Sequence, residues 1–335
     1  MKNIFTIKIT EQSGVSEARR LSQYASTAMG FNETDKGRIS IIVTELCRNL
    51  VKHALHGGEF HLYRLKRGEH EGLEMLAIDK GPGIRNVAEA MRDGFSTAGS
   101  PGTGMGSVKR LSDFFDIYSI EGQGTVILSR MWVNKQFFED QKFEISGINL
   151  PKPGQEVSGD KWAWRQEQDG ITVMIADGLG HGIEASDAAN EAVRAFEDTR
   201  SGGTDKIVQA MHQRLTHTRG AAVAVSGLDL RAKIVRYCGV GNISGSILSP
   251  AGSRSMISHN GIVGHEARRI QIFDYPWTEG SMMIMHSDGM SARWNMEKYP
   301  GLMIKSTSII CGVLYRDYAR GNDDFTVVTM RAAGA

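Results

Sequence analysis

The stretch ITVMIADGLGHG, residues Ile171–Gly182, decides how the second half of the chain folds. Apolar and β-branched residues run into Asp177, and glycines follow at 178, 180 and 182. This pattern predicts a strand that delivers a carboxylate to its own end and then turns tightly. Helix-forming residues 184–198 come next and complete a strand–turn–helix unit. A lone Asp-Gly pair is usually just a turn, but a carboxylate beside backbone carbonyls is also a suitable ligand set for a hard cation.

The length and composition indicate two globular domains. A chain of 335 residues with 41% hydrophobic and 23% charged content can bury two separate cores. The net charge of +1 gives no support for binding nucleic acid or an anionic membrane. The N-terminus has no apolar signal core, and no apolar run approaches the ~18–20 residues of a membrane helix. We therefore expect a cytoplasmic protein without a membrane segment.

Three more segments of the second half place a carboxylate at an end of an apolar strand. They contain Asp160 in VSGD, Asp288 in HSDG, and the pair Asp323 and Asp324 in NDDFT. Because sheets gather strand ends, we expect these carboxylates to meet Asp177. Oxygen-only ligands favour Mg²⁺ or Mn²⁺ over zinc. Two such ions can activate a water and hold a phosphoryl group for in-line attack.

A helix in the first half presents two polar side chains on one face. The apolar residues of KGRISIIVTELCRNLVKHAL, residues 36–55, follow helical spacing. Glu45 and Asn49 are four residues apart, so they lie one turn apart on a shared face. By themselves they would equally suit an ordinary solvent-exposed face.

Two glycine-rich turns follow that helix. The strand in LEMLAIDKGPGI, residues 73–84, runs into Asp79 and then Gly81 and Gly83. The loop with Gly102, Gly104 and Gly106 opens directly into a helix, whose unpaired N–H groups suit phosphates. No Gly-Lys-Ser/Thr closes this loop, so it is not a P-loop.

Taken together, these motifs resemble the GHKL ATP-binding fold shared by gyrase, histidine kinases and Rsb-type serine kinases, over roughly residues 1–133. The run MRDGFSTAGSPGTGMGSVKRLSDFFDIYS, residues 91–119, is most similar to RsbT-like switch kinases of the stressosome. The resemblance implies binding of ATP with Mg²⁺. It also implies the following roles: Glu45 as general base, Asn49 as Mg²⁺ ligand, Asp79 as acceptor from the adenine amino group within a box that includes Gly81 and Gly83, Gly102, Gly104 and Gly106 over the phosphates, and Thr125 supporting the adenine contact.

The order VSGD, ADGLGHG, HSDG, NDDFT resembles the metal-dependent protein serine/threonine phosphatases of the PPM/SpoIIE type, above all RsbX-like members, over about residues 142–335. The resemblance implies two Mn²⁺ or Mg²⁺ ions. It further implies that Asp177 bridges both metals, the Gly178 carbonyl binds one with support from Asp160, and Asp288 and Asp323 complete the other site. Asp324 has no firm role. How phosphate is held stays open, with Lys161 and Arg165 as nearby candidates, and His181 is interpreted as a turn residue rather than a proton donor.

The sequence thus predicts an α/β (α+β) protein: a GHKL two-layer α/β sandwich over 1–133, a short linker over 134–141 and a PPM-type α-β-β-α sandwich over 142–335. We expect a bifunctional stressosome or partner-switching regulator, a serine/threonine kinase joined to an opposing phosphatase. The resemblance implies STAS-domain phosphoproteins (RsbS/RsbR-like) as substrates. It also allows a downstream phosphatase or an anti-sigma system component as a further partner, and a homodimer.

Two alternatives to the kinase remain open. The first domain could be a nucleotide-dependent module that binds a partner without phosphorylating it. It could also be an ATPase in which Glu45 activates water.

Overall fold

Two compact units make up the chain in the computed structural model, which describes residues 2–54, 57–68, 70–91, 104–134 and 142–333. Unit 1 contains Met1–Glu139 together with Met296–Arg316, and unit 2 contains Asp140–Asn295 together with Asp317–Ala335. Both units combine helices with largely antiparallel sheets, which confirms the predicted fold class. Most of the predicted linker lies outside the described residues, and the boundaries at 133 and 142 stay predictions.

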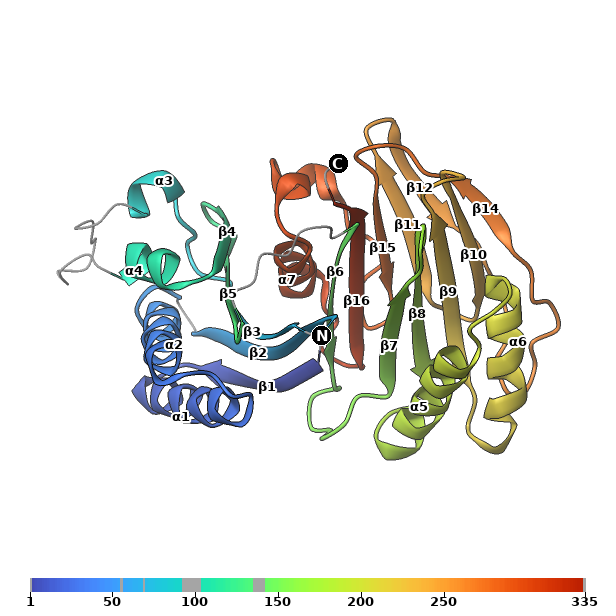
Figure 1. Ribbon diagram of the computed structural model, residues 1–335, viewed down its shortest axis with the longest axis horizontal. Helices are drawn as coiled ribbons and strands as arrows, with labels where there is room; N and C mark the ends of the chain where they lie inside the picture. The colour runs from blue at the N-terminus through green and yellow to red at the C-terminus, as the bar shows by residue number, and fades with distance from the viewer. Residues whose placement is uncertain (1, 55–56, 69, 92–103, 135–141, 334–335) are drawn as a thin grey trace. The chain divides into compact units, whose positions relative to one another are not determined.

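Unit 1 is built on a five-stranded antiparallel sheet with the helices of its N-terminal part packed on one face (Figure 1). The strand order is β1-β2-β3-β5-β4. The strands are β1 (Lys2–Ile9), β2 (Gly58–Arg67), β3 (His70–Asp79), β4 (Phe114–Ile120) and β5 (Gly124–Trp132). The helices of the N-terminal part are α1 (Gln12–Ala28), α2 (Glu33–His53), α3 (Val87–Ala90) and α4 (Gly104–Leu111).

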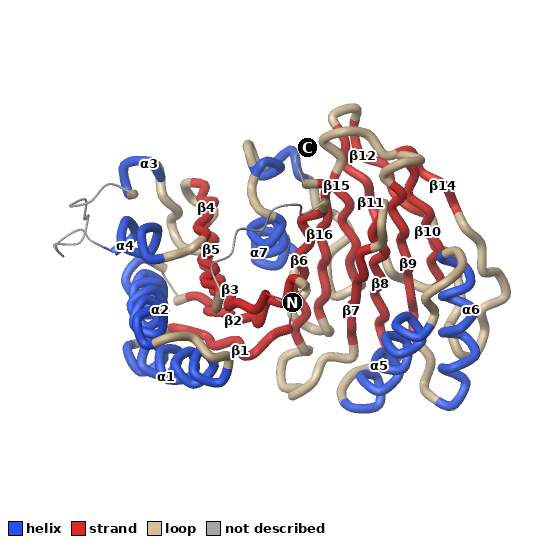
Figure 2. The backbone as a smooth tube through the Cα atoms, viewed as in Figure 1, coloured by secondary structure: helices blue, strands red, loops and turns tan. Residues whose placement is uncertain are grey.

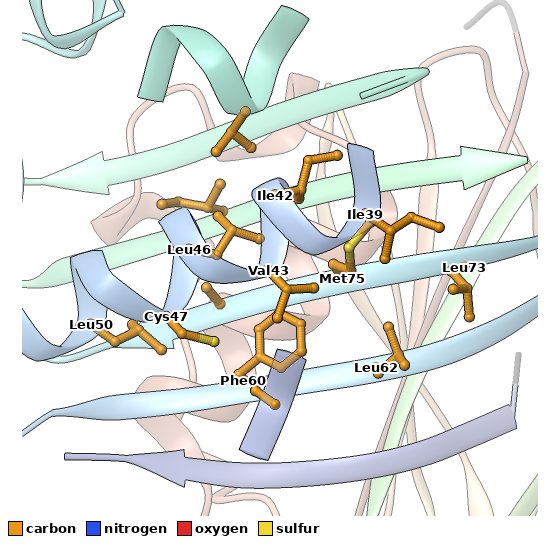
Figure 3. Packing of buried hydrophobic residues seen from close by; sticks show 14 of the residues in the cluster. Ile39, Ile42, Val43, Leu46, Cys47, Leu50, Phe60, Leu62, Leu73 and Met75 are labelled. Atoms are coloured by element: carbon orange, nitrogen blue, oxygen red, sulfur yellow. The ribbon is translucent and has the colours of Figure 1, made fainter. Parts of the chain in front are cut away.

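Helix α2 is the packing centre of unit 1. The side chain of its N-cap residue, Asn32, accepts a hydrogen bond from the Asp35 amide at 2.8 Å. This bond satisfies one of the free N–H groups of the first turn. Apolar residues at helical spacing, such as Leu46, then pack against Phe60 and Met75 of the sheet (Figure 3). The same spacing leaves Glu45 and Asn49 half-buried at the edge of this core.

Helix α7 (Thr307–Tyr318) comes from far along the chain, yet its residues up to Arg316 belong to unit 1. It is buried along most of its length, as its apolar sequence requires. Gly312 is its point of closest approach to the sheet: a Cβ at that position would lie 2.7 Å from Cγ1 of Val126. Two short 3₁₀ helices, Met296–Lys298 and Leu302–Ile304, lead into α7.

Unit 2 contains two stacked sheets, drawn as two sets of red strands in Figure 2. The first has the order β13-β10-β9-β8-β7, with β14 paired to β10, and the second has the order β12-β11-β15-β16-β6. The strands are β6 (Phe143–Leu150), β7 (Asp160–Gln166), β8 (Gly170–Gly178), β9 (Ala221–Asp229), β10 (Ile234–Val240), β11 (Ser244–Ser249), β12 (Gly252–Met256), β13 (Ser258–His259), β14 (Phe273–Pro276), β15 (Met282–His286) and β16 (Phe325–Ala332).

The first sheet of unit 2 has a different core on each face. Residues of alternate strand positions, including Val173 and Ile175, face the second sheet and pack against its methionines Met283 and Met285. On the other face, Met174 and Ala176 pack under α5 (Ile183–Asp198) and α6 (Thr204–Arg214), which ends in a 3₁₀ turn at Leu215–His217. None of the helices in the described ranges is long and apolar enough to cross a membrane.

Candidate functional site

In unit 1, the start of α4 lies directly against Glu45. A Cβ at Gly104 would be 2.9 Å from Oε2 of Glu45, so any larger residue at this position would displace the carboxylate. Asn49 lies one turn further along α2 and is half-buried like Glu45. The structure therefore brings a helix N-terminus, a carboxylate and an amide together from segments far apart in sequence. Gly106 is buried within α4, whereas Gly102 lies outside the described residues.

Asp79 ends β3 beside the second glycine turn. Its Oδ1 accepts a hydrogen bond from the Gly81 amide at 2.7 Å, which aims the carboxylate across the turn. Burial raises the pKa of this carboxyl, while hydrogen bonds from the Gly81 and Thr125 amides oppose the shift. Gly83 has a φ of +70°, and a Cβ there would meet the Ile120 carbonyl oxygen at 2.0 Å, so no other residue fits.

Thr125 sits next to Asp79 in the paired strands β3 and β5. Its Oγ1 is 2.9 Å from the hydroxyl of Ser119, and that hydroxyl also accepts from the Ile84 amide at 2.7 Å. The hydroxyl of Ser119 therefore ties Thr125 to the turn that follows Asp79. This link was missed by the sequence analysis, because Ser119 reaches the turn only through the strand pairing of β4 with β5.

In unit 2, Asp160 and Asp177 are direct neighbours across the paired strands β7 and β8. Asp160 is 1% exposed, and both of its carboxylate oxygens are buried without a hydrogen-bond partner. A buried carboxylate in this condition needs either a proton or a cation. The all-oxygen character of its surroundings fits Mg²⁺ or Mn²⁺.

The remaining three aspartates approach from the ends of two other strands. Asp288 follows β15 and accepts a hydrogen bond from the side-chain amide of Asn242 at 2.8 Å. Asp323 and Asp324 precede β16; Asp323 is half-buried, whereas Asp324 is buried and has one oxygen without a partner. Burial first, and then the charges of Asp160, Asp288 and Asp323, hold the pKa of Asp177 well above its usual range. Asp177 therefore lies close enough to Asp160, Asp288 and Asp323 for their charges to act on it.

The carboxylates do not form a complete metal cage by themselves. Over the described ranges, no three His, Cys, Asp or Glu side chains are already gathered in a geometry that could hold a metal ion. Waters and backbone carbonyls would therefore have to supply further ligands, which is usual for Mg²⁺. Gly178, whose carbonyl is one of the predicted ligands, is closely constrained: its amide donates to the Gly159 carbonyl at 3.1 Å, and a Cβ there would collide with the Ala185 carbonyl oxygen at 2.0 Å.

The two cations considered for holding phosphate are engaged in local structure. The Lys161 ammonium donates to the carbonyl of Ser158 at 2.7 Å, to that of Asp160 at 3.1 Å and to the hydroxyl of Ser186 at 3.1 Å, which uses its three N–H groups. The Arg165 guanidinium stacks on Phe196 and donates to its carbonyl.

Arg219 is a better placed cation that the sequence analysis missed. One guanidinium nitrogen would lie 3.1 Å from a Cβ at Gly180, in the glycine turn that follows Asp177, and the other end pairs with Glu184. The side chain is 51% exposed, so it can reach a ligand from solvent. His181, between Gly180 and Gly182, is exposed as well. The guanidinium reaches this turn through the Leu179–Gly220 backbone hydrogen bond, which sequence spacing does not reveal.

The fold and these two sites define an ATP-binding domain of the histidine kinase-like class joined to a metal-dependent phosphatase domain. Residues 10–131 match the family model of the histidine kinase-like ATPase domain, and residues 167–332 match that of stage II sporulation protein E (SpoIIE). The chain belongs to the histidine kinase-like ATPase family through an RsbT-like region, and its C-terminal region is a SpoIIE/PPM domain homologous to RsbX.

Two curated relatives each match one half. The serine/threonine-protein kinase RsbT of Bacillus subtilis (strain 168) is 35% identical over 127 residues, which is 38% of this chain and 95% of that protein. The phosphoserine phosphatase RsbX of the same organism is 24% identical over 157 residues, which is 47% of this chain and 79% of that protein. The chain is therefore similar to a kinase and to a phosphatase at once.

Two solved structures share the phosphatase-like fold. A chain from work on the bacterial stressosome, described as a modular system adapted to control secondary messenger signalling, is 27% identical with a TM-score of 0.54 and covers 57% of this chain and 100% of its own. RsbX in complex with magnesium is 22% identical with a TM-score of 0.53 and covers 59% of this chain and 99% of its own. Together, the matches of the two halves make the chain a partner-switching regulator with a kinase-like module and a PPM phosphatase domain.

Proposed function

We propose that the chain carries two opposed activities on one substrate class: transfer of the γ-phosphoryl group of ATP-Mg to serine or threonine in unit 1, and hydrolysis of the resulting phosphate ester in unit 2. The observation that carries the phosphatase half is the cross-strand pair Asp160 and Asp177, in which both carboxylate oxygens of Asp160 are buried without a hydrogen-bond partner. The kinase half is supported by Glu45 lying against the start of α4.

In unit 2, Asp177, Asp160, Asp288, Asp323 and the Gly178 carbonyl would hold two divalent ions. When bound, such ions lower the pKa of a shared water and neutralise the phosphoryl oxygens. The side chains of this chain do the rest: Asn242 orients Asp288, and Arg219 holds the phosphate of the incoming phosphoserine or phosphothreonine with its forked N–H groups. Asp324 lies beside Gly159, the residue before Asp160, and its charge adds to the raised pKa of Asp160.

In unit 1, Glu45 would accept the proton of the attacking serine or threonine hydroxyl, and Asn49 would hold Mg²⁺. Asp79 and Thr125 would bind the adenine end, with Gly81 and Gly83 shaping that turn. Gly102, Gly104 and Gly106 would cover the phosphates, where the free N–H groups and dipole of α4 favour negative charge. Removal of the hydroxyl proton by a positioned carboxylate such as Glu45 accelerates phosphoryl transfer ~10²–10⁴-fold.

The substrates that fit this pairing are STAS-domain phosphoproteins of the RsbS or RsbR kind. The support is that one half is similar to the kinase RsbT, the other to the phosphatase RsbX, and that the chain is also similar to a protein from work on the bacterial stressosome. A downstream phosphatase or an anti-sigma component would be a second partner class, and unit 1 could pair with a second copy. Either Mn²⁺ or Mg²⁺ suits the unit 2 ligands.

A radiolabelling experiment tests the proposal. A STAS protein encoded beside this chain is incubated with labelled ATP and the wild type, Asp177→Asn, Glu45→Ala or the double variant. Exposed matched controls are Asp187→Asn on α5 and Glu17→Ala on α1. We expect label to accumulate in Asp177→Asn, to be transient in wild type and the controls, and to be absent in both variants that lack Glu45, although these still bind ATP.

The alternative predicts a different pattern. If no label appears even in Asp177→Asn while wild type still cleans a prephosphorylated substrate, unit 1 is a nucleotide-dependent binding module and the kinase proposal is wrong. Release of free phosphate from ATP without any labelled protein would instead indicate an ATPase.

A further inference from the structure

The segment Met296–Arg316, here called the coupling segment, belongs to the compact unit that holds the ATP-binding residues. Yet it lies within residues 167–332, which match the SpoIIE family. It contains most of α7, which packs on the face of the sheet turned away from α2 (Figure 1). Side-chain alternation agrees: Ala77 and Ile127 face the α2 core, so Ile78 and Val126 face the other way, toward Gly312.

Polar contacts hold the coupling segment at its middle. The Ser308 hydroxyl donates to Oε2 of Glu74 at 2.9 Å and accepts from Arg130 Nη2 at 2.9 Å. Glu74 and Arg130 form an ion pair at 2.6 Å, and both are buried in the sheet. A buried ion pair is costly unless its remaining hydrogen bonds are made; Ser308 makes one to each partner, while Oε1 of Glu74 is left without a partner. The position of α7 is therefore determined by these polar contacts as well as by close packing.

Three more contacts lie near the two ends of α7. Lys305 pairs with Asp116 at 3.0 Å, and the Ser306 amide donates to the same carboxylate at 2.9 Å. Near the other end, the Tyr315 hydroxyl donates to Glu59 at 2.8 Å. The coupling segment is thus fixed to β2, β3, β4 and β5, so a distortion of this sheet would displace α7.

The adenine-binding end of the sheet is directly adjacent to this contact. A Cβ at Gly312 would lie 2.7 Å from Val126, 3.5 Å from Leu76 and 3.7 Å from Ile78. Ile78 and Val126 are the chain neighbours of Asp79 and Thr125, the proposed adenine ligands. Closely packed groups transmit small displacements because protein interiors have few voids.

On both sides of the coupling segment, the chain leads to aspartates of unit 2. The aspartates of that site, Asp160, Asp177, Asp288, Asp323 and Asp324, are here called the carboxylate cluster. Met290 and Ala319 form a β-bridge, the Ser291 amide donates to the Tyr318 carbonyl at 2.9 Å, and the Arg320 amide donates to the Gly289 carbonyl at 2.9 Å. Gly289 follows Asp288, and Arg320 closely precedes Asp323 and Asp324. This bridge closes the base of the coupling segment close in sequence to Asp288 and Asp323, two of the candidate metal ligands.

We propose that the coupling segment transmits nucleotide binding in unit 1 to the Asp288 and Asp323 ends of the carboxylate cluster in unit 2, so that nucleotide sets the phosphatase rate. This inference rests on the proposed function of both sites. Filling of the adenine site shifts Ile78 and Val126 under Gly312, α7 moves with them, and the Met290–Ala319 bridge moves the aspartates. By linkage, whatever factor nucleotide applies to metal affinity in unit 2, metal applies to nucleotide affinity in unit 1; this reciprocity concerns the two affinities and not the hydrolysis rate.

Hydrogen exchange on the full chain tests the coupling without relying on activity. Amide exchange in residues 287–295 and 317–324 is compared with and without a non-hydrolysable ATP analogue plus Mg²⁺. In parallel, p-nitrophenyl phosphate hydrolysis is measured at saturating Mn²⁺. We expect the analogue to change exchange at Ser291 and Arg320, and to change hydrolysis by on the order of five-fold or more.

Two variants of α7 and one control decide whether the segment is the route. Ser308→Ala removes the link to Glu74 and Arg130, and Gly312→Ala places a methyl against Val126. Gly37→Ala on α2, which has open space around it, is the matched control. We expect the first two to lose most of the nucleotide effect while keeping nucleotide affinity, and the control to keep both.

The outcomes separate the two hypotheses. If saturating nucleotide leaves exchange and hydrolysis of wild type unchanged, or no nucleotide binds, the coupling is wrong. It is equally wrong if both α7 variants keep the full nucleotide effect. If hydrolysis is absent under all conditions, the phosphatase proposal fails, while exchange at the bridge still decides the coupling.

Discussion

Asp160 and Asp177 occupy directly paired positions of β7 and β8, and both oxygens of Asp160 are buried without a hydrogen-bond partner. Burial raises the pKa of both carboxyls; the charges of Asp324 and Asp288 raise that of Asp160 further, and the charges of Asp160, Asp288 and Asp323 raise that of Asp177 further. The arrangement destabilises the metal-free fold and favours any divalent cation that can enter. Several of its consequences can be measured.

The first prediction concerns pH and metal. Because the folded-state pKa of Asp177 lies above its ordinary value of 3.8, the metal-free folded chain holds protons that the unfolded chain has released. Its free energy of unfolding should therefore fall as pH rises from about 4 through neutrality. In EDTA, we expect the melting temperature of wild type to fall more between pH 5 and pH 8 than that of Asp177→Asn. Added Mn²⁺ should raise the melting temperature of wild type more at pH 8 than at pH 5. An equal pH dependence in both proteins would contradict the assignment.

The second prediction concerns Arg219. A charge-assisted hydrogen bond to phosphate contributes ~1.5–3 kcal/mol, so Arg219→Ala should raise KM for a phosphoprotein about 10- to 100-fold. Metal affinity, measured by calorimetry, should not change. Arg194→Ala is the control, since Arg194 is an exposed, ion-paired residue on α5. A lower kcat with an unchanged KM would show that Arg219 does not hold the substrate phosphate.

The third prediction concerns Gly104. A methyl group there would lie 2.9 Å from Oε2 of Glu45, so Gly104→Ala must displace that carboxylate. We expect phosphoryl transfer to fall on the order of ten-fold or more because a general base acts only within hydrogen-bond reach of its proton. The melting temperature should stay close to that of Gly37→Ala. Normal transfer in Gly104→Ala would argue against Glu45 as the base.

The fourth prediction concerns the ion pair beneath α7. Replacing only Arg130 by Met leaves Glu74 charged and buried, which should lower the free energy of unfolding by about 3–5 kcal/mol. The double variant with Glu74→Leu removes both charges and should recover most of this loss. Urea unfolding followed by circular dichroism measures both. Equal losses in the single and double variants would mean that packing, rather than the unpaired charge, dominates.

Much of the candidate site was predictable from local sequence. The spacing of Glu45 and Asn49 on a helix, and the carboxylate at the end of each apolar strand, follow from helical and strand periodicity. The glycines at 83 and 180 are required by positive φ angles. By contrast, Asn242, Ser119 and Arg219 were missed because each reaches its site through strand pairing or a turn contact.

The sequence by itself determined the two folds, the order of the motifs and the type of chemistry, since these depend on periodicity and on residue types at fixed spacings. Only the tertiary structure decided that Met296–Arg316 packs with the ATP-binding sheet. Helix α7 is apolar on nearly all sides, so its pattern predicts burial but not the surface against which it is buried. That choice is made by Glu74, Arg130 and Gly312, which are far apart in the chain and become a complementary set only when the sheet has formed.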